Sequence, residues 1–477
     1  MRLSLLYFCL LSATLLSAQD PGPWTLERAV AYALENNLQV RQLDYSQQTA
    51  ELQLRQARNN RLPTISAGSN LSYQLGRTVD PTSNSFAQQN IFSQNINVQA
   101  SVQLYGGGQI RNTILQREVD ARAAALDRRV TANNTGLQVA NAYLTVVLTR
   151  EQLANARRQL DLTTENLSNT DKLIRAGSVP AGQRYDILAT QAGNQQTVVE
   201  LENAVAQNLL QLQLLLELDP SADFDVVAPD LEPTDADLFA GFEPEAVLEA
   251  ARTTQPTIQA AELRQQSARL GEDVARAGFR PTVGLFANLS TNYSNLAKTF
   301  SDEGSEIIFI PTQVEFQGQL VDLGLPQRVG GSIEDISYPD QLNQNFGQLA
   351  GISLQVPIFS RGQNKTNLAL ARLQSERAAL DREQAVNQLR SDVETALTDL
   401  RAAQEAYRAA RVSQEAAQFA YDNAERRYSA GAGNSLDLVT ATNRLQQAET
   451  NLTRTKYQLI FNREVIEFYL GQGLSLD

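Results

Sequence analysis

The chain has 477 residues, of which 53 are acidic and 40 are basic, and its net charge is −13. This negative charge argues against nucleic-acid binding, because the neutralisation of phosphates requires clustered lysine and arginine. The chain has no histidine, which excludes histidine-based catalysis and histidine metal ligands. Pairs of carboxylates are no evidence for a hydrolase here, because they are abundant in any chain this acidic. We therefore predict no enzymatic activity, no catalytic or cofactor-binding residue and no metal site.

Residues 1–18 have the pattern of a secretory signal peptide, with an apolar stretch from Leu3 to Leu16 and small residues at Ser17 and Ala18. The alternative is an N-terminal anchor helix, but the apolar stretch is shorter than the roughly 18 residues that a membrane span needs. Cleavage after Ala18 would remove Cys9, the only cysteine. The mature chain would then form no disulfide, and its stability would come from packing.

The rest of the chain is predicted to consist of two similar halves. Asn70-Leu71-Ser72 recurs as Asn288-Leu289-Ser290, and Ala124–Arg128 recurs as Ala378–Arg382. The second pair is more widely separated, so one loop of the second half carries an insertion. Repeats this long are copies of a larger motif rather than solenoid units. We assign a first repeat at 19–216, an acidic, proline-containing linker at 217–242, a second repeat at 243–470 and a tail at 471–477.

Each half contains two predicted strands, at about 64–73 and 96–105 in the first half and at about 282–293 and 349–359 in the second. Their residues alternate between an apolar face and a face that is polar but uncharged, and their lengths suit tilted transmembrane strands. A half-buried sheet of a soluble protein alternates in the same way, so the strands alone do not decide between a soluble sheet and a membrane barrel. The residues predicted to face lipid in a membrane barrel are Val98, Val102, Leu104, Leu285, Leu289, Leu354 and Val356.

Other segments of each half are predicted from local signals. A helix opens each half, beginning near Thr25 in the first and near Glu243-Pro244 in the second. The connections between paired strands, at about 74–95 and 294–347, are expected to be irregular loops, and the second carries the insertion. Four strands cannot close a barrel within one chain, so a barrel would require several copies.

Long helical hairpins are predicted after each strand pair, at about 106–216 and 360–470. From Leu389, apolar residues step by four and three along a heptad seam through Val393 and Leu400, with a polar interruption at Gln414. A helix from about Gly362 to Ala430 would be roughly 100 Å long at about 1.5 Å per residue. The same register occurs in the first half. The seam predicts packing between neighbouring helices.

The sequence at the strand ends and hairpin turns resembles the TolC family of outer-membrane channel-tunnel proteins over about residues 24–470. No single motif is decisive for this resemblance, but the order, duplication and spacing of the motifs together are hard to obtain otherwise. The segments that carry the resemblance are Leu104–Gly108, Ile358–Gly362, Arg175–Gly177 with Tyr185–Leu188, and Arg427–Gly431 with Ser435–Val439.

The resemblance implies a mixed α and β membrane protein of the cell outer membrane. Three chains with four strands each would form a 12-stranded β-barrel, continued by an α-helical tunnel in the periplasm. Such a homotrimer is the passive exit duct of a tripartite efflux pump or of a type I secretion system. The implied partners are a periplasmic adaptor (membrane fusion) protein, an inner-membrane transporter of the RND, ABC or MFS type, and outer-membrane lipid, but no nucleic acid.

The family's tunnel narrows at the hairpin turns. Tyr428 matches an aromatic position of this constriction and Asp437 an acidic one, with Asp186 as the first-half equivalent. The position of the family's gate arginine is Gly433 here and that of its second acidic residue is Thr440, so the arginine-centred network is not reproduced. Asp437 could instead act only as a carboxylate at a helix N-terminus, after a Ser435 cap.

A different class of protein, a periplasmic coiled-coil scaffold that binds other proteins, would also explain the signal peptide and the heptads. It does not explain four matched strands with uncharged polar faces. Drug efflux, metal efflux and protein secretion stay open. A mature chain without histidine, methionine or cysteine weakly disfavours the handling of soft metals.

Overall fold

The computed structural model describes residues 24–79, 84–88, 90–228, 233–234, 238 and 241–472. The predicted signal peptide and most of the predicted C-terminal tail lie outside these residues. The chain divides into two compact units. The helical unit contains the described residues of Met1–Gln53, Arg117–Ala268 and Leu373–Asp477, and the strand unit contains those of Leu54–Gln116 and Arg269–Arg372.

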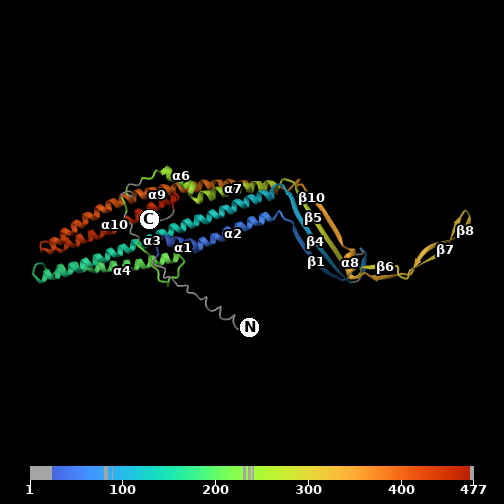
Figure 1. Cartoon of the computed structure of the whole chain (residues 1–477), viewed down its shortest axis with the longest axis horizontal. Coiled ribbons are helices and arrows are strands. Elements are labelled where there is room, and N and C mark those ends of the chain that lie inside the picture. Colours follow the sequence, from blue (N-terminus) through green and yellow to red (C-terminus); the bar gives the residue numbers. More distant parts are fainter. Residues whose placement is uncertain are drawn as a thin grey trace, which may run out of the picture. The chain divides into compact units, whose positions relative to one another are not determined.

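Both halves of the chain have the same order of main elements (Figure 1). The first half contains α1 (Leu26–Asn36), α2 (Leu38–Asn59), β1 (Thr64–Gln74), β4 (Ile91–Gly106), α3 (Gln109–Arg175) and α4 (Gln183–Leu215). The second half contains α6 (Pro244–Thr254), α7 (Pro256–Ala277), β5 (Thr282–Ser294), β10 (Gly347–Gln355), α9 (Gln363–Ser429) and α10 (Ser435–Tyr469). As expected, Thr25 caps α1, and α6 has its proline in the first turn.

The helix that opens each half is interrupted once, which the sequence analysis did not predict. Asn37 separates α1 from α2 and Gln255 separates α6 from α7, and both have an extended backbone. The side-chain amide of Asn37 donates to the carbonyl oxygen of Leu215 at 3.2 Å, and that of Gln255 donates to Phe468 at 3.2 Å. Each break therefore docks on the end of a hairpin helix of its own half.

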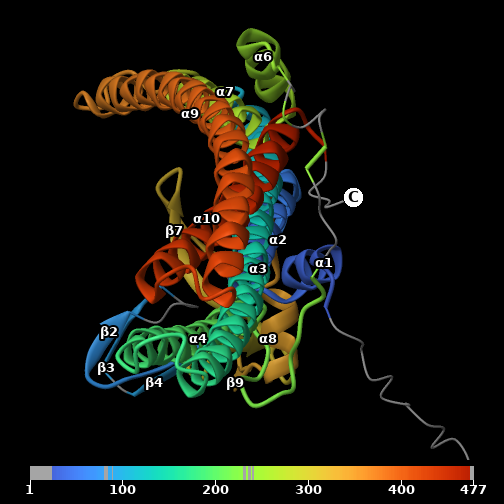
Figure 2. The ribbon, with the colours of Figure 1, turned by 90° about the vertical axis from the view of Figure 1, so that its left-hand side faces the viewer.

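The predicted heptad seam is buried. Val393, Leu397 and Leu400 form part of one apolar cluster, and Val139 and Val146 occupy the corresponding positions of another in the first half. Figure 2, which looks toward the hairpin turns, shows α4 beside α3 and α10 beside α9. Full burial of one such side chain contributes about 1.5–3 kcal/mol, so the seams hold the hairpins together. None of the described helices is long and apolar enough to cross a membrane.

The linker between the halves is fixed to α3. Trp24 and Val226 form an isolated parallel β-bridge. The Tyr143 hydroxyl lies 2.9 Å from the carbonyl oxygen of Trp24 and 2.5 Å from that of Val227, and Arg150 donates to the carbonyl of Val226 at 2.7 Å. Burial raises the pKa of Tyr143 to about 12. The start of the predicted linker is therefore held against the middle of a hairpin helix.

The four main strands form one antiparallel sheet in the order β1-β4-β5-β10. The last strand differs from the prediction, because β10 ends at Gln355 rather than near residue 359. Gln355 pairs with Thr282, the first residue of β5, so no partner strand continues beyond it. Pro357 also lacks the N–H group that a ladder requires. Val356, predicted as a lipid-facing strand residue, consequently lies after the end of the strand.

The connections between strands contain regular structure that was predicted as irregular loop. The first contains β2 (Arg77–Val79) and β3 (Phe86–Gln88), which pair with each other. The second contains β6 (Lys298–Ser301) paired with β9 (Ser332–Asp335), β7 (Glu306–Phe316) paired with β8 (Gln319–Val329), and α8 (Tyr338–Gln344). The buried Gln341 joins α8 to the end of β5, since its side chain accepts from Ser294 N and donates to Ser294 O.

Candidate functional site

Strand pairing sorts the sheet into two faces. Val98 lies opposite Ala67 on β1 and Leu289 on β5, and Val102 lies opposite Leu285. Directly paired residues of an antiparallel sheet point to the same face, and successive residues alternate. The face defined in this way is apolar, and we call it the apolar face. It carries five of the residues predicted to face lipid, which are Val98, Val102, Leu285, Leu289 and Leu354.

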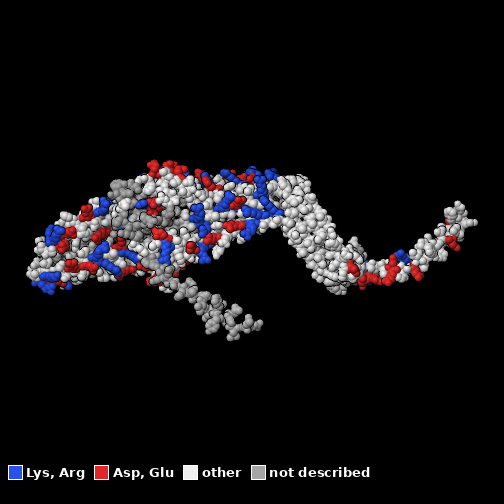
Figure 3. Space-filling view, in the orientation of Figure 1, with Lys and Arg blue, Asp and Glu red and all other residues white. Residues whose placement is uncertain are grey.

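The opposite face is polar and uncharged over most of its area. Gln99, for example, lies between Ser66 on β1 and Asn288 on β5. No residue of β1, β4, β5 or β10 is charged. Figure 3 shows the sheet as a white band without acidic or basic side chains. Both faces are open to the surroundings, and Leu354 on the apolar face is 67% exposed.

Aromatic residues mark both ends of the apolar face. At the end remote from the helices, the rings of Phe92 and Tyr293 lie 6.1 Å apart and those of Tyr293 and Tyr338 lie 5.0 Å apart. At the other end, Tyr105 is 49% exposed. The strand from Phe92 to Tyr105 spans about 43 Å, or about 33 Å in height at a tilt of about 40°. This height matches a hydrocarbon core of about 30 Å with aromatic borders.

Charged residues resume beyond both borders, with opposite signs (Figure 3). At the ends of the helices that lead into the strands they are mostly basic, and include Arg58, Arg61, Arg111, Arg276, Arg280, Arg361 and Lys365. At the remote end they are mostly acidic, and include Asp302, Glu303, Glu306, Glu334 and Asp335. The uncharged zone is therefore confined to the sheet.

The junction between β4 and α3 is tightly packed. The ladder shifts register between Gln103 and Tyr105, so Leu104 is the extra residue of a bulge, and pairing does not assign it to a face. Gly107 follows with φ of +64°, and a Cβ atom there would lie 2.7 Å from Arg280 Cβ and 2.8 Å from the carbonyl oxygen of Ala277. Glycine is required here both for its backbone conformation and for the close approach.

Both hairpin turns are built in the same way. In the second turn, Ala432 N donates to the Arg427 carbonyl at 2.9 Å and Gly431 N donates to the Tyr428 carbonyl at 3.0 Å. This is a Schellman motif, in which a residue with positive φ ends the helix, and Gly431 has φ of +71°. Gly177, with φ of +72°, has the same place in the first turn. The duplication therefore extends to the turns that carry the predicted constriction residues.

Two of the three predicted constriction residues join the hairpins of one chain to each other. Tyr428 is buried, and its hydroxyl lies 2.8 Å from Thr170 Oγ1 on α3. Asp186, near the start of α4, accepts a hydrogen bond from Ser435 Oγ at 2.9 Å. Turn motifs in the sequence point to Tyr428 and Asp186 but not to their partners, because a contact between separate hairpins leaves no signal in local spacing.

Asp437 is exposed near the start of α10, and the cap of this helix differs from the prediction. The cap is Asn434, whose side-chain oxygen accepts from Asp437 N at 2.9 Å. Ser435 is instead the first helical residue, and its hydroxyl is directed to Asp186. Asp437 lies in the first turn, where the helix dipole favours a carboxylate.

Residue 433 leaves little room for a side chain. A Cβ atom on Gly433 would lie 3.1 Å from Tyr428 N, tighter than most such contacts. Several cations lie near the turns. Arg175 and Arg427 are in the last turns of α3 and α9, and the Nε atom of Arg184 on α4 lies 3.0 Å from Asp171 Oδ1 on α3. Thr440, at the family's second acidic position, is exposed on α10.

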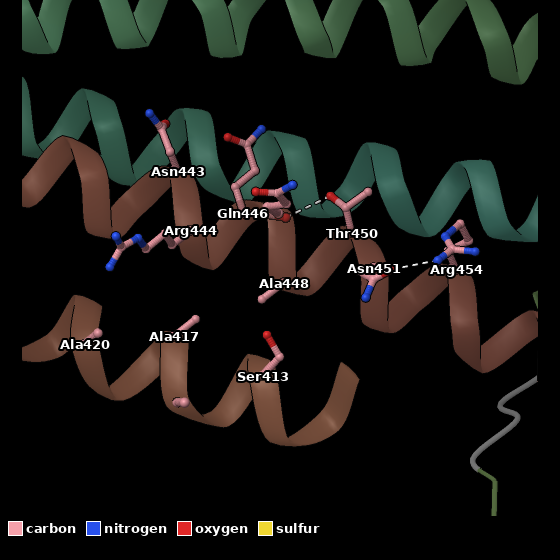
Figure 4. Close-up of a pocket in the computed structure, with 12 residues that line it drawn as sticks. Ser413, Ala417, Ala420, Asn443, Arg444, Gln446, Ala448, Thr450, Asn451 and Arg454 are labelled. Carbon is pink, nitrogen blue, oxygen red and sulfur yellow. Dashed lines mark hydrogen bonds between the residues drawn. The ribbon is translucent and has the colours of Figure 1, made fainter. Parts of the chain in front are cut away.

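A groove of about 990 Å³ runs between α9 and α10 (Figure 4). Small side chains such as Ala417 and Ala420 line it from α9, and polar ones such as Asn443, Arg444 and Asn451 line it from α10. It contains no carboxylate. Within the described part of the chain, no group of three or more histidine, cysteine or acidic residues could hold a metal ion.

A sheet with one apolar and one uncharged polar face, joined to two long helical hairpins, defines the class of outer-membrane channel proteins with helical extensions. Comparison with known families agrees. The model of the outer membrane efflux protein family matches residues 29–217 and 341–472. The chain belongs to this family and is a protein of the outer membrane that serves efflux. Its family and fold are those of channel proteins rather than of enzymes.

Individual relatives are distant in sequence but similar in fold. The probable outer membrane lipoprotein SilC of Salmonella typhimurium is 21% identical over 455 residues, which cover 94% of this chain and 85% of SilC. The crystal structure of CusC has a TM-score of 0.74 at 19% identity and covers 94% of this chain and 92% of CusC. The open state of the MtrE outer membrane channel of Neisseria gonorrhoeae has a TM-score of 0.70 at 22% identity, covering 95% and 90%.

Proposed function

We propose that three copies of the chain close their sheets into one 12-stranded barrel in the outer membrane, continued by a helical tunnel in the periplasm. The observation that carries this proposal is the four-stranded sheet itself, in which β1 and β10 each pair with only one of the described strands, beside an exposed apolar face. An open edge in lipid leaves backbone groups without partners. Identical copies arranged in a ring remove every edge.

In this barrel the apolar face contacts lipid and the uncharged polar face lines a water-filled duct. The duct is a passive conduit for exported small molecules or proteins. A periplasmic adaptor protein would seal it to an inner-membrane transporter of the RND, ABC or MFS type, which supplies the energy. The family match supports efflux over secretion, and it supports the channel over the periplasmic scaffold.

The periplasmic entrance is assigned to the hairpin turns, with Asp437, Asp186 and Tyr428 at the constriction. The exposed carboxylate of Asp437 is free to point into the passage, and three copies would bring three such carboxylates together. Confined negative charge attracts cations and repels anions, less so at high salt. The Tyr428–Thr170 and Asp186–Ser435 contacts hold the two hairpins of each chain in register.

Planar bilayer recordings test this function. The detergent-purified protein should insert and give discrete currents with a preference for cations. Asp437→Asn should keep the fold, since asparagine also suits a helix start, but should reduce cation selectivity. Glu245→Gln, which removes an exposed carboxylate on α6, should leave selectivity unchanged. A protein that stays soluble without detergent and carries no current would favour the scaffold instead.

A further inference from the structure

The paired strands β7 and β8, which we call the ribbon, lie in the connection between β5 and β10. They fall between the two ranges that match the family model. Each strand has 11 residues, which gives the ribbon a length of about 37 Å. Within the described residues, no third strand pairs with the ribbon. A lone two-stranded ribbon is marginally stable in water, so we expect packing against a partner to stabilise it.

The ribbon has two unlike faces. Ile310 lies opposite Leu325 and Val314 lies opposite Val321, on a face that also carries Ile308, Phe316, Leu323 and Val329. These side chains are between 37% and 66% exposed. Away from Glu306 at the base, the only polar residues on this face are uncharged. The other face carries the charges of Glu315, Asp322 and Arg328, together with three exposed apolar residues, Ile307, Phe309 and Leu320. The two faces therefore differ in charge: one is apolar and uncharged beyond Glu306, and the other is mixed.

The long edges of the ribbon are poor sites for adding another strand. Pro311 lies within β7 and Pro326 within β8, and both take part in an unbroken ladder. A proline has no N–H to give to the ladder, so it fits only where its nitrogen faces away from the partner strand. Each outer edge consequently lacks a donor, as in natural edge strands that resist pairing. Association is left to the apolar face.

The size of this face indicates what covers it. Two strands, each about 4.8 Å wide and about 37 Å long, give a footprint of roughly 350 Å², well below the roughly 800 Å² per partner of a stable interface between free proteins. Copies already tethered in one barrel need far less area, because their effective concentration is on the order of millimolar. A threefold axis also places three identical ribbons at the same height.

Charge argues against the membrane surface as the partner. The base of the ribbon, formed by β6, β9 and their turns, carries Asp302, Glu303, Glu334 and Asp335 against Lys298. An acidic base is repelled by anionic lipid headgroups. The acidic residues lie at the base, so the apolar faces of β7 and β8 in neighbouring copies can pack together beyond the base without bringing these charges into contact.

We propose that the ribbons of three copies pack apolar face to apolar face as a cap over the mouth of the barrel remote from the helices. This inference rests on the trimer proposed above. The charged faces of the ribbons then contact water, and the apolar faces are buried against one another. The cap narrows the exit of the duct.

Cysteine crosslinking tests this packing in the full-length trimer. Leu323→Cys places a thiol on the apolar face, and the adjacent Asp322→Cys places one on the charged face as a matched control. With a short bis-maleimide, Leu323→Cys should give covalent dimers of the chain several-fold faster than Asp322→Cys. The difference should persist at high salt, because salt screens the repulsion between the acidic bases without weakening apolar contact.

A deletion tests the effect on the exit. The carbonyl oxygen of Gly304 lies beside Gly330, so joining Gly304 directly to Gly331 removes the ribbon with little change to its base. This variant should remain a trimer by light scattering and pass a larger single-channel current.

Several results would overturn the inference. Equal crosslinking of the two cysteine variants in an intact trimer, or an unchanged current after deletion, would do so while leaving the proposed function in place. Crosslinking that is lost on transfer from detergent to lipid nanodiscs would show that the ribbon lies on lipid. A monomeric protein would overturn both proposals.

Discussion

Replacing Val98 with arginine would place a guanidinium group at the centre of the apolar face. Val98 lies about midway along β4 between the aromatic borders at Phe92 and Tyr105, beside Ala67 and Leu289. Arginine at the bilayer midplane of a barrel costs about 2–4 kcal/mol. Three copies in one barrel would raise this to about 6–12 kcal/mol if the sites act independently, which is comparable to the whole stability of a typical domain.

The matched control is Gln99→Arg on the same strand. Its side chain belongs to the opposite face, between Ser66 and Asn288, which would line the water-filled interior of the proposed barrel. Val102→Arg tests the dependence on depth in the membrane. Val102 is close to the Tyr105 border, so its substitution should destabilise the barrel less than Val98→Arg does. The assay is folding into lipid vesicles from urea, with the folded fraction measured by protease resistance of the strands. Equal folding of Val98→Arg and Gln99→Arg would refute the assignment of the faces.

Three further predictions concern the packing. The pKa of Tyr143 is raised from 10.0 to about 12, so its contribution to stability is complete below pH 10 and is lost as the pH rises toward 12. Tyr143→Phe should therefore lose less thermal stability than the unchanged protein between pH 10 and pH 12. At neutral pH the same substitution should cost about 1 kcal/mol. Gly107→Ala should lower the thermal unfolding midpoint, through strain of roughly 1–3 kcal/mol, whereas Gly182→Ala, whose added Cβ atom meets no other atom within 4 Å, should not. Leu400→Ala, in the buried seam, should cost about 2–5 kcal/mol in denaturant titration.

The elements that the sequence predicts well are those with a sustained period. The heptad seam through Val393 and Leu400 runs for many turns, and the alternation around Val98 runs for a whole strand, so both patterns are recognisable. The ribbon was predicted as irregular loop because Ile307 and Phe309 interrupt its alternation and because prolines such as Pro311 and Pro326 are rare inside strands. The break at Asn37 gave no signal either, since its reason is a hydrogen bond to Leu215, which is remote in sequence.

The candidate constriction shows the same difference between features with a local sequence pattern and features that depend on remote contacts. Tyr428, Asp186 and Asp437 could be selected because they lie in recognisable turn segments. The contact of Tyr428 with Thr170 joins two hairpins, and only the tertiary structure reveals it. The cap of α10 was misplaced by one residue, because Asn434 and Ser435 both suit a cap and the hydroxyl of Ser435 is directed to the other hairpin.

We expect the outer edges of β1 and β10 to be closed by two further copies of the same chain. Native mass spectrometry of the protein released from detergent micelles tests this most directly. A mass of three mature chains, with no smaller folded species over a range of protein concentrations, is the predicted result. A folded monomer that keeps its strands in the absence of detergent would contradict it.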